Sequence, residues 1–159
     1  MLVNLWLKIN QFFVYPLLHL YWRMSRGMTL GVRAIVINDK NEVFLIKHSY
    51  TPGWGLPGGG VEPGETFQQA LIKELHEEGN IIDFQAVFFS VYLNNVTTNR
   101  DHVVLYIIKS FSQPHFPKAN AEIIDHQWVS IESLPDNLMR GVKDRLDEYK
   151  GLTAINPYW

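Results

Sequence analysis

The segment from Gly59 to Glu78 constrains the fold of this chain more than any other. It is preceded and opened by glycines and prolines, PGGGVEPG over residues 57–64, which permit tight turns and a close approach of the backbone to other groups. A helical pattern follows and predicts a helix that begins near Glu65 or Thr66, with Thr66 as its capping residue. The sequence therefore predicts a glycine-rich loop that leads directly into a helix.

The predicted helix carries Glu74, Glu77 and Glu78 on its apolar side, given about 100° of rotation per residue. The apolar residues of that side are Phe67, Ala70, Leu71 and Leu75. Carboxylates at this spacing repel one another and are costly to bury without a partner. A divalent cation removes the conflict, because Mg²⁺ takes oxygen ligands from one or two carboxylates and completes its shell with water and substrate phosphates.

The spacing resembles the Nudix box, in which Gly, five residues, Glu and seven residues precede Arg-Glu-aliphatic-any-Glu-Glu-any-Gly-aliphatic. Gly59, Glu65, the run from Lys73 to Glu78, and Ile81 match this pattern. Lys73 departs from the pattern, which has Arg at this position. Lysine keeps the positive charge but lacks the planar guanidinium that binds two carboxylate oxygens. We therefore expect Lys73 to position a neighbouring carboxylate less rigidly. Asn80 replaces Gly and tolerates the left-handed conformation, so we expect no loss there.

The resemblance implies a Mg²⁺-dependent hydrolase, with Mn²⁺ as the alternative ion, in which water attacks a phosphoanhydride. The substrate is then a nucleoside diphosphate linked to another moiety: a nucleoside triphosphate, ADP-ribose, a nucleotide sugar or a dinucleoside polyphosphate. Glu77 and Glu78 are the implied metal ligands, and Glu74 either adds a ligand or orients the attacking water. The carbonyl oxygen of Gly58 or Gly59 is a further candidate ligand. Two other readings are a noncatalytic Nudix-like module that binds a nucleotide, and an isopentenyl diphosphate isomerase, which the lack of cysteine disfavours.

Residues outside the helix supply candidates for the remaining roles. Many family members take a further base or ligand from another loop, and the candidates in order are Glu122, Asp101 and His102, each with the alternative of an ordinary surface role. The backbone of Gly58, Gly59 and Gly60 is the expected substrate cradle. Candidate substrate-binding side chains are Tyr50 and Trp54, which flank the loop and are suited to stack on a nucleobase, and Arg33, suited to a phosphate. Core packing is the alternative for the aromatics, and a solvated surface position is the alternative for Arg33.

Composition limits the classes of partner. The 14 basic and 16 acidic residues nearly cancel, so no broad basic surface suited to duplex nucleic acid is expected. The chain has no cysteine, which excludes disulfides, thiolate metal sites and thiol nucleophiles and fits a cytoplasmic location. The resemblance implies a small-molecule nucleotide diphosphate as the partner.

Residues 1–28 form an apolar segment ahead of the domain expected at residues 29–159. Apolar residues recur at helical spacing and predict a short amphipathic helix ending near Pro16. Polar residues interrupt the segment, so we expect neither a membrane-spanning helix nor a signal peptide. Two interpretations stay open for residues 1–26: packing against the domain or a second subunit, as in a homodimer, and weak contact with a membrane surface.

The remaining periodicity is that of a mixed α/β domain. Strands are predicted at residues 29–37, 42–47, 84–93, 102–111 and 123–129, with a hairpin turn at residues 38–41 and a final helix at residues 137–149. The resemblance covers residues 29–150 and implies an α/β/α sandwich with a mixed β-sheet.

Overall fold

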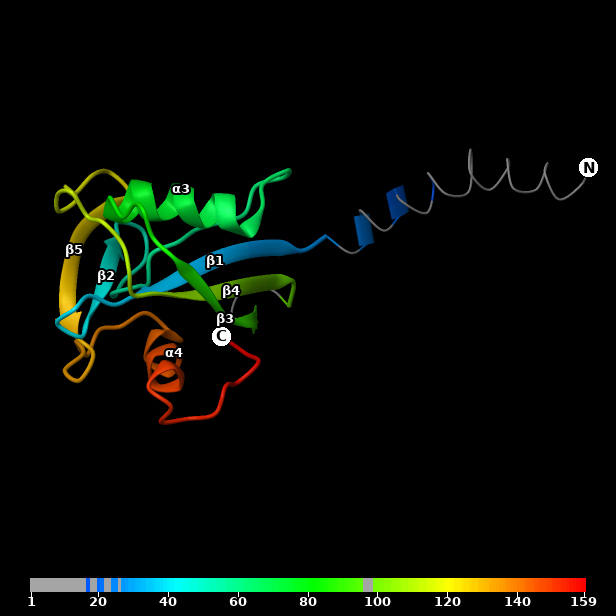
Figure 1. Ribbon diagram of the computed structural model, residues 1–159. Helices are drawn as coiled ribbons and strands as arrows, with labels where there is room; N and C mark the ends of the chain where they lie inside the picture. The colour runs from blue at the N-terminus through cyan, green and yellow to red at the C-terminus, as the bar shows by residue number, and fades with distance from the viewer. Residues whose placement is uncertain (1–16, 18–19, 22–23, 26, 96–98) are drawn as a thin grey trace, which may run out of the picture.

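The structure is a computed structural model that describes residues 17, 20–21, 24–25, 27–95 and 99–159. Figure 1 shows the elements in chain order. They are β1 (Thr29–Val36), β2 (Glu42–His48), α3 (Phe67–Gly79), β3 (Ala86–Asn94), β4 (Asp101–Ile108), β5 (Ile123–Ser130) and α4 (Val142–Tyr149). The strands predicted from periodicity are all found, with ends shifted by one to three residues.

The strands form two sheets. One has the order β1-β4-β3, with β1 parallel to β4 and β3 antiparallel to β4, so it is mixed. The other pairs β2 with β5 in antiparallel fashion. The expectation that β2 returns along β1 was wrong, apart from one bridge between Ile37 and Val43 beside the predicted turn. The free edge of β1 is occupied instead by residues 57–61 of the glycine-rich loop.

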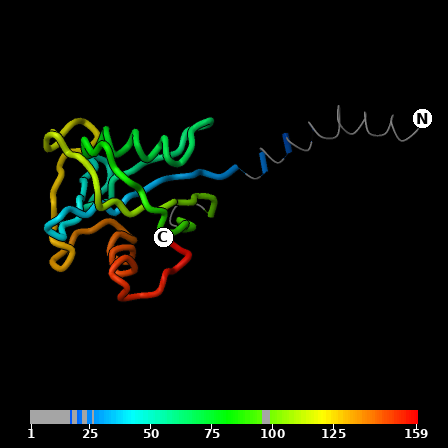
Figure 2. Tube along the Cα trace, viewed as in Figure 1, coloured from blue at the N-terminus to red at the C-terminus, as the bar shows by residue number. Residues whose placement is uncertain are grey.

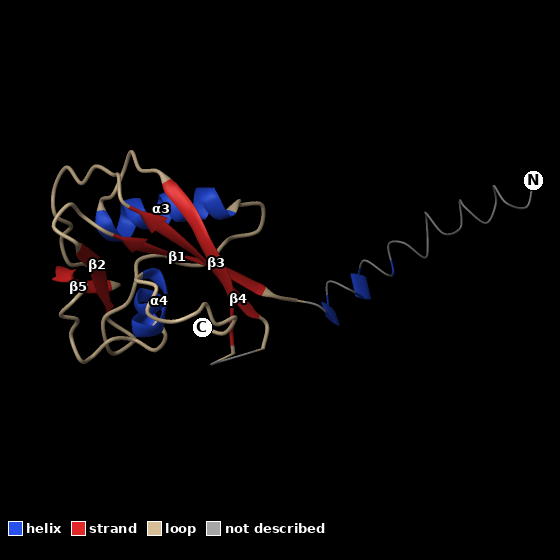
Figure 3. Ribbon diagram, turned by 60° about the horizontal axis from the view of Figure 1, so that its bottom comes forward, coloured by secondary structure: helices blue, strands red, loops and turns tan. Residues whose placement is uncertain are grey.

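The helices α3 and α4 cover opposite faces of the sheets (Figures 1 and 3). Side chains alternate across β1, so Val32, Ala34 and Val36 join the apolar cluster under α3. Ile35 and Ile37 join a second cluster under α4. This arrangement is an α/β/α sandwich, as the resemblance implied.

The helix α3 forms as the sequence predicts. Thr66 is its N-cap, and its hydroxyl accepts a hydrogen bond from the Gln69 backbone while the Gln69 side chain accepts one from the Thr66 backbone. At the other end, Asn80 is left-handed with φ 50°. The position where asparagine replaces glycine is therefore filled by a residue that adopts the required conformation.

The helix α4 begins five residues later than predicted, at Val142 and not at residue 137. The preceding residues are held by the backbone of Trp54. Its backbone N–H donates to the Asn137 carbonyl at 2.9 Å, and its carbonyl accepts from the Met139 backbone N–H at 2.8 Å. Gly141, with φ 81°, then turns the chain into the helix. A long-range pairing therefore replaces the first turn of the expected helix.

The chain returns to the edge of β3 after α4, as the tube in Figure 2 shows. At the other terminus, Leu17, Leu20, Tyr21 and Met24 are exposed, and the predicted helix up to Pro16 lies outside the described residues. Among the described residues no helix combines the length and apolar character needed to cross a bilayer. Homodimer packing and membrane contact through residues 1–26 remain predictions.

Candidate functional site

The glycine-rich loop is clamped between β1 and α3. Its backbone bonds to β1, where Val32 N–H donates to the Gly59 carbonyl at 2.9 Å and Ala34 N–H donates to the Pro57 carbonyl at 3.0 Å. Gly58 has φ 133°, and a Cβ there would lie 2.2 Å from the Val32 carbonyl oxygen. A Cβ on Gly59 would lie 2.4 Å from the carboxyl carbon of Glu74. The backbone of β1 therefore requires glycine at position 58, and a side chain at position 59 would displace the Glu74 carboxylate.

Glu78 is the most buried carboxylate of the box, with 6% of its surface exposed. It accepts a hydrogen bond from Gly58 N–H at 2.6 Å, and its Oε1 lies 3.9 Å from His48 Nε2. Burial raises the pKa of Glu78 to about 8, although the Gly58 hydrogen bond and the charge of Arg33 both lower it. Without a cation the side chain is therefore largely protonated near neutral pH.

Glu74 lies one turn earlier, against Gly59, and is half-buried. Burial is the largest influence on its pKa and raises it, while Lys73 opposes this effect and Glu77 adds to it. Glu77 itself is exposed, so the expectation that it shares the buried side of α3 was wrong. It lies at the solvent-facing rim of the carboxylate cluster, and Glu74 and Glu78 form the buried part.

Lys73 contacts two carboxylates of the box. Its Nζ lies 3.3 Å from Glu65 Oε1 and 3.6 Å from Glu74 Oε1. Glu65 also accepts a hydrogen bond from the Glu62 N–H at 3.0 Å, which ties the loop to the same group. Lys73 is thus placed to orient Glu74 and not Glu77. It contacts one oxygen of Glu74, whereas the planar guanidinium of an arginine can bind both oxygens of a carboxylate.

The carboxylates and the loop suit a hard divalent cation. Among the described residues, no three His, Asp or Glu side chains are arranged to hold a metal ion. Mg²⁺ needs only one or two protein carboxylates when water and substrate phosphates supply the rest. Glu74 and Glu78 meet that requirement, and burial raises the pKa of both carboxyls more than the nearby charges of Lys73 and Arg33 lower it. The Gly59 carbonyl already accepts from Val32 N–H and keeps a second lone pair for a cation.

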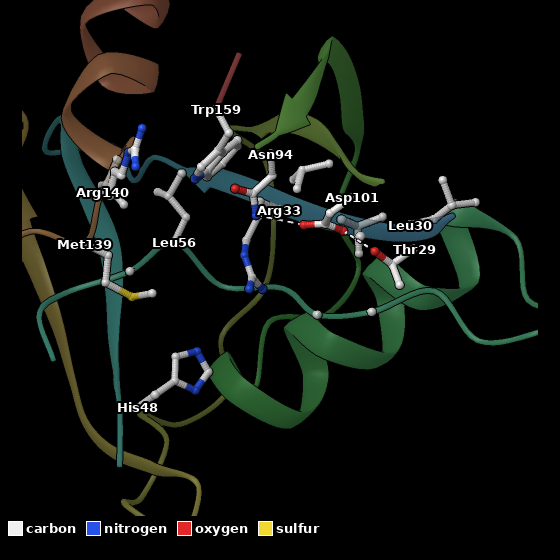
Figure 4. A pocket seen from close by; sticks show the side chains of 17 residues that line it. Thr29, Leu30, Arg33, His48, Leu56, Asn94, Asp101, Met139, Arg140 and Trp159 are labelled. Carbon is white, nitrogen blue, oxygen red and sulfur yellow. Dashed lines mark hydrogen bonds between the residues drawn. The ribbon is translucent and has the colours of Figure 1, made fainter. Parts of the chain in front are cut away.

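A cavity of about 320 Å³ opens beside the loop (Figure 4). It lies between β1, the loop and the start of α4. Its lining residues are Thr29, Leu30, Gly31, Val32, Arg33, His48, Gly55, Leu56, Gly59, Gly60, Asn94, Asp101, Val103, Met139, Arg140, Val142 and Trp159. The walls therefore combine apolar and aromatic side chains with a few polar groups, as ligand sites commonly do.

Arg33 extends into this cavity toward His48 (Figure 4). Its Nη1 and the Nδ1 of His48 are buried without a hydrogen-bond partner. Burial, and next the charge of Arg33, lower the pKa of His48, which favours its neutral form. A buried guanidinium nitrogen without a partner is costly. An anionic ligand such as a phosphate would satisfy it.

The three candidates outside the box occupy different places. Tyr50 OH lies 3.4 Å from Glu122 Oε1, and the rings of Tyr50 and His48 are 5.0 Å apart. The charge of Glu122 raises the pKa of Glu78, so Glu122 lies near the C-terminal end of α3. Asp101 lines the cavity but already accepts from Thr29 Oγ1 at 2.9 Å and from Asn94 Nδ2 at 2.7 Å. Neither His102 nor Glu122 lines the cavity, and we keep Glu122 as the first candidate because its charge acts on both Glu78 and His48.

The aromatic candidates separate by burial. Tyr50 is 69% exposed and lies beside His48. Trp54 is only 8% exposed and packs in the apolar cluster under α4, so the proposal that it stacks on a nucleobase was wrong. Trp159 lies in the cavity wall, and the sequence did not predict this. Its position depends on pairing with β3, which is far away in the sequence.

The burial of Glu78 predicts a pH-dependent stability. Its pKa is about 8 in the folded protein against 4.5 as the ordinary value, so between these values the folded state binds more protons than the unfolded state. The stability of the metal-free protein should therefore fall throughout that interval as the pH rises, and the range to measure is its upper part, from about pH 6.5 to about pH 8. The lowered pKa of His48 places its titration below this range. The effect is measured as the change of melting temperature with pH across this range. Glu78→Gln should make the melting temperature nearly independent of pH. An equally steep dependence in that variant would show that another group causes it.

Comparisons with known proteins agree with this geometry. The family model of the NUDIX domain matches residues 27–149. A Bacillus subtilis (strain 168) protein named "Putative 8-oxo-dGTP diphosphatase" is 27% identical over 129 residues, 80% of this chain and 85% of that protein. An RNA pyrophosphohydrolase of Legionella pneumophila is 46% identical over 52 residues, 33% of this chain and 30% of its own length. The MutT NUDIX hydrolase structure from Burkholderia pseudomallei superposes with a TM-score of 0.66 at 24% identity, over 76% of this chain and 97% of that one, and supports the fold.

Proposed function

The chain belongs to the Nudix hydrolase family, and we propose that it uses a divalent cation to cleave a phosphoanhydride in a nucleoside diphosphate linked to another moiety. The observation that carries the proposal is the half-buried Arg33, whose Nη1 atom is buried without a hydrogen-bond partner in a cavity that adjoins the glycine loop. A positive charge on one side and a cation site on the other suit a chain of two phosphates. The names of the relatives, a diphosphatase and a pyrophosphohydrolase, point to the same class of reaction.

Each element of the site has a role in this proposal. Glu74 and Glu78 would hold Mg²⁺, with the exposed Glu77 completing the site from the rim and Lys73 orienting Glu74. The bound cation would neutralise phosphate charge and lower the pKa of the attacking water. Arg33 would bind the phosphates from the cavity side. Gly60 has open space where a Cβ would stand, so a phosphate can approach the backbone there.

Glu122 would act as the general base in the same scheme. Its carboxylate is exposed beside Tyr50, where it can take a proton from the attacking water. The water oxygen then forms a bond to phosphorus, the bridging P–O bond of the anhydride breaks, and the departing phosphate carries away the electron pair. No covalent intermediate on the protein is needed, in keeping with the absence of cysteine.

A substrate panel tests the proposal. The full-length protein is incubated with nucleoside triphosphates, ADP-ribose, nucleotide sugars and dinucleoside polyphosphates, with Mg²⁺ or Mn²⁺, and products are separated by chromatography. We expect at least one substrate to yield a nucleoside monophosphate, and EDTA to abolish the reaction. Phosphomonoesters should be poor substrates, because they lack the second phosphate. Activity that EDTA leaves undiminished, or nucleotide binding with no cleavage of any substrate, would contradict the proposal.

A further inference from the structure

We propose that Trp159 selects the substrate by stacking its indole on the nucleobase in the cavity. The inference rests on the proposed function for the placing of the phosphates near Arg33 and the glycine loop. It adds that Trp159, at the end of residues 152–159 that follow α4, is the part of the cavity wall that recognises the group attached to those phosphates. The argument depends on how this segment is held and on what its last side chain faces.

Two backbone hydrogen bonds fix the segment to the edge of β3. Leu93 N–H donates to the Pro157 carbonyl at 2.8 Å, and Trp159 N–H donates to the Leu93 carbonyl at 3.0 Å. The segment thereby extends the sheet by a short parallel bridge between Leu93 and Tyr158. Because Asn94 follows Leu93 and lines the cavity, this pairing brings Trp159 to the cavity as well.

A buried ion pair holds the same segment from the side of α4. Arg145 is 1% exposed and Glu148 is 6% exposed, and their Nη2 and Oε1 atoms lie 2.6 Å apart. Arg145 Nη1 donates to the Tyr158 carbonyl at 2.7 Å, and Asn156 N–H donates to Glu148 Oε1 at 2.8 Å. Tyr92 OH donates to the other oxygen of Glu148 at 2.8 Å. These two buried charges bond to the backbone of the segment, so moving the segment would leave a buried charge without a partner. The segment is therefore held in one position.

The indole of Trp159 is packed on several sides. The Tyr92 ring meets it edge-on at 5.6 Å between centroids, and the Arg145 guanidinium carbon lies 5.7 Å from its centre. A Cβ on Gly141 would lie 2.7 Å from the indole Nε1, so that glycine leaves room for the ring. The ring is nevertheless only half-buried and forms part of the cavity wall. Its orientation is therefore set before a ligand arrives, which lowers the entropic cost of stacking.

The rest of the cavity suits a base. Leu56 and Met139 add apolar surface near Trp159, and Asn94 and Asp101 add polar groups (Figure 4). The volume of about 320 Å³ lies at the small end of the roughly 300–1,000 Å³ typical of ligand pockets, enough for one nucleoside-sized group. A flat aromatic ring with polar edges matches such walls, since every base presents a face that stacks on tryptophan. A phosphate presents no such face.

Binding measurements separate recognition of the base from recognition of phosphate. The dissociation constants of nucleoside monophosphates and of inorganic pyrophosphate are measured by calorimetry, with Ca²⁺ in place of Mg²⁺, for the full chain and three variants. Trp159→Ala should weaken binding of the best nucleoside monophosphate by roughly tenfold to a hundredfold, the range expected for loss of one base stack. Pyrophosphate affinity should not change. Trp159→Phe should keep most of the affinity, and Leu152→Ala, an exposed change in the same segment, should keep all of it.

The outcomes distinguish this inference from the proposed function. Unchanged nucleotide affinity in Trp159→Ala overturns the inference, and so does an equal loss for both ligands, which would mean a general disturbance of the site. A wild-type protein that binds pyrophosphate but no nucleotide overturns the inference and leaves anhydride hydrolysis standing. A wild-type protein that binds nucleotides through Trp159 but cleaves none supports the inference and refutes the hydrolase. Binding of neither ligand refutes both.

Discussion

Replacing Glu78 with glutamine is expected to reduce turnover by about a hundredfold or more, while the protein stays folded. The loss follows from removing a negative charge from the cation site, and losses of about this size accompany removal of charge stabilisation at catalytic centres. The fold should survive because glutamine keeps an oxygen to accept the Gly58 hydrogen bond and no longer places an ionisable group in a buried position. The measurement is kcat at saturating substrate and Mg²⁺, with circular dichroism and melting temperature as tests of folding.

Two further variants bracket this result. Glu77 is exposed, so we expect Glu77→Gln to leave folding unchanged. Its turnover should fall by a similar factor if Glu77 completes the cation site from the rim. Glu62→Gln removes an exposed carboxylate from the same loop without touching the site and should keep near-normal turnover. A Glu78→Gln protein that retains more than about a third of the wild-type turnover would contradict the assignment of Glu78 to the cation site.

Adding a methyl group at Gly59 is expected to reduce turnover by roughly tenfold to a hundredfold, by pushing the Glu74 carboxylate away. The added carbon would stand 2.4 Å from the carboxyl carbon of Glu74, and that flexible group must move. Since the obstacle is the end of a side chain, the cost to stability should be small. Turnover and melting temperature of Gly59→Ala are measured together to separate the two effects.

The neighbouring glycines give matched controls for stability. In Gly58→Ala the new carbon meets the backbone of Val32 at 2.2 Å and the residue has φ 133°, so the melting temperature should fall markedly. In Gly60→Ala nothing lies within 4 Å of the new carbon, and the melting temperature should stay the same. Full turnover in Gly59→Ala would show that the position of Glu74 does not matter for the reaction.

The site could be foreseen from the sequence where its geometry is local. The cap at Thr66, the turn at Asn80 and the shared face of Glu74 and Glu78 depend on residues within one or two helical turns, so spacing predicts them. The exposure of Glu77 was not predicted, because helical periodicity places a residue within a broad arc and the loop decides how much of that arc is covered. Local reasoning therefore located the cluster of carboxylates but not how deeply each of them is buried.

The long-range features could not be foreseen. The pairing of β2 with β5, the late start of α4 behind Trp54, and the entry of Trp159 into the cavity all depend on contacts between segments far apart in the chain. The partial burial of Arg33 is similar, because alternation along β1 fixes its side of the sheet but not what covers it. These are the features that shape the cavity, so the sequence indicates the reaction more clearly than the substrate.

Hydrolysis in ¹⁸O-labelled water tests the central claim most directly. With the best substrate of the panel and Mg²⁺, water attack on phosphorus places one ¹⁸O atom on a phosphate product, which mass spectrometry detects. We expect that label, on a nucleoside monophosphate or on the phosphate-containing partner released with it. Label on a sugar or another carbon-bound hydroxyl, or efficient hydrolysis of p-nitrophenyl phosphate without cleavage of any anhydride, would contradict the account even though the fold is that of the family.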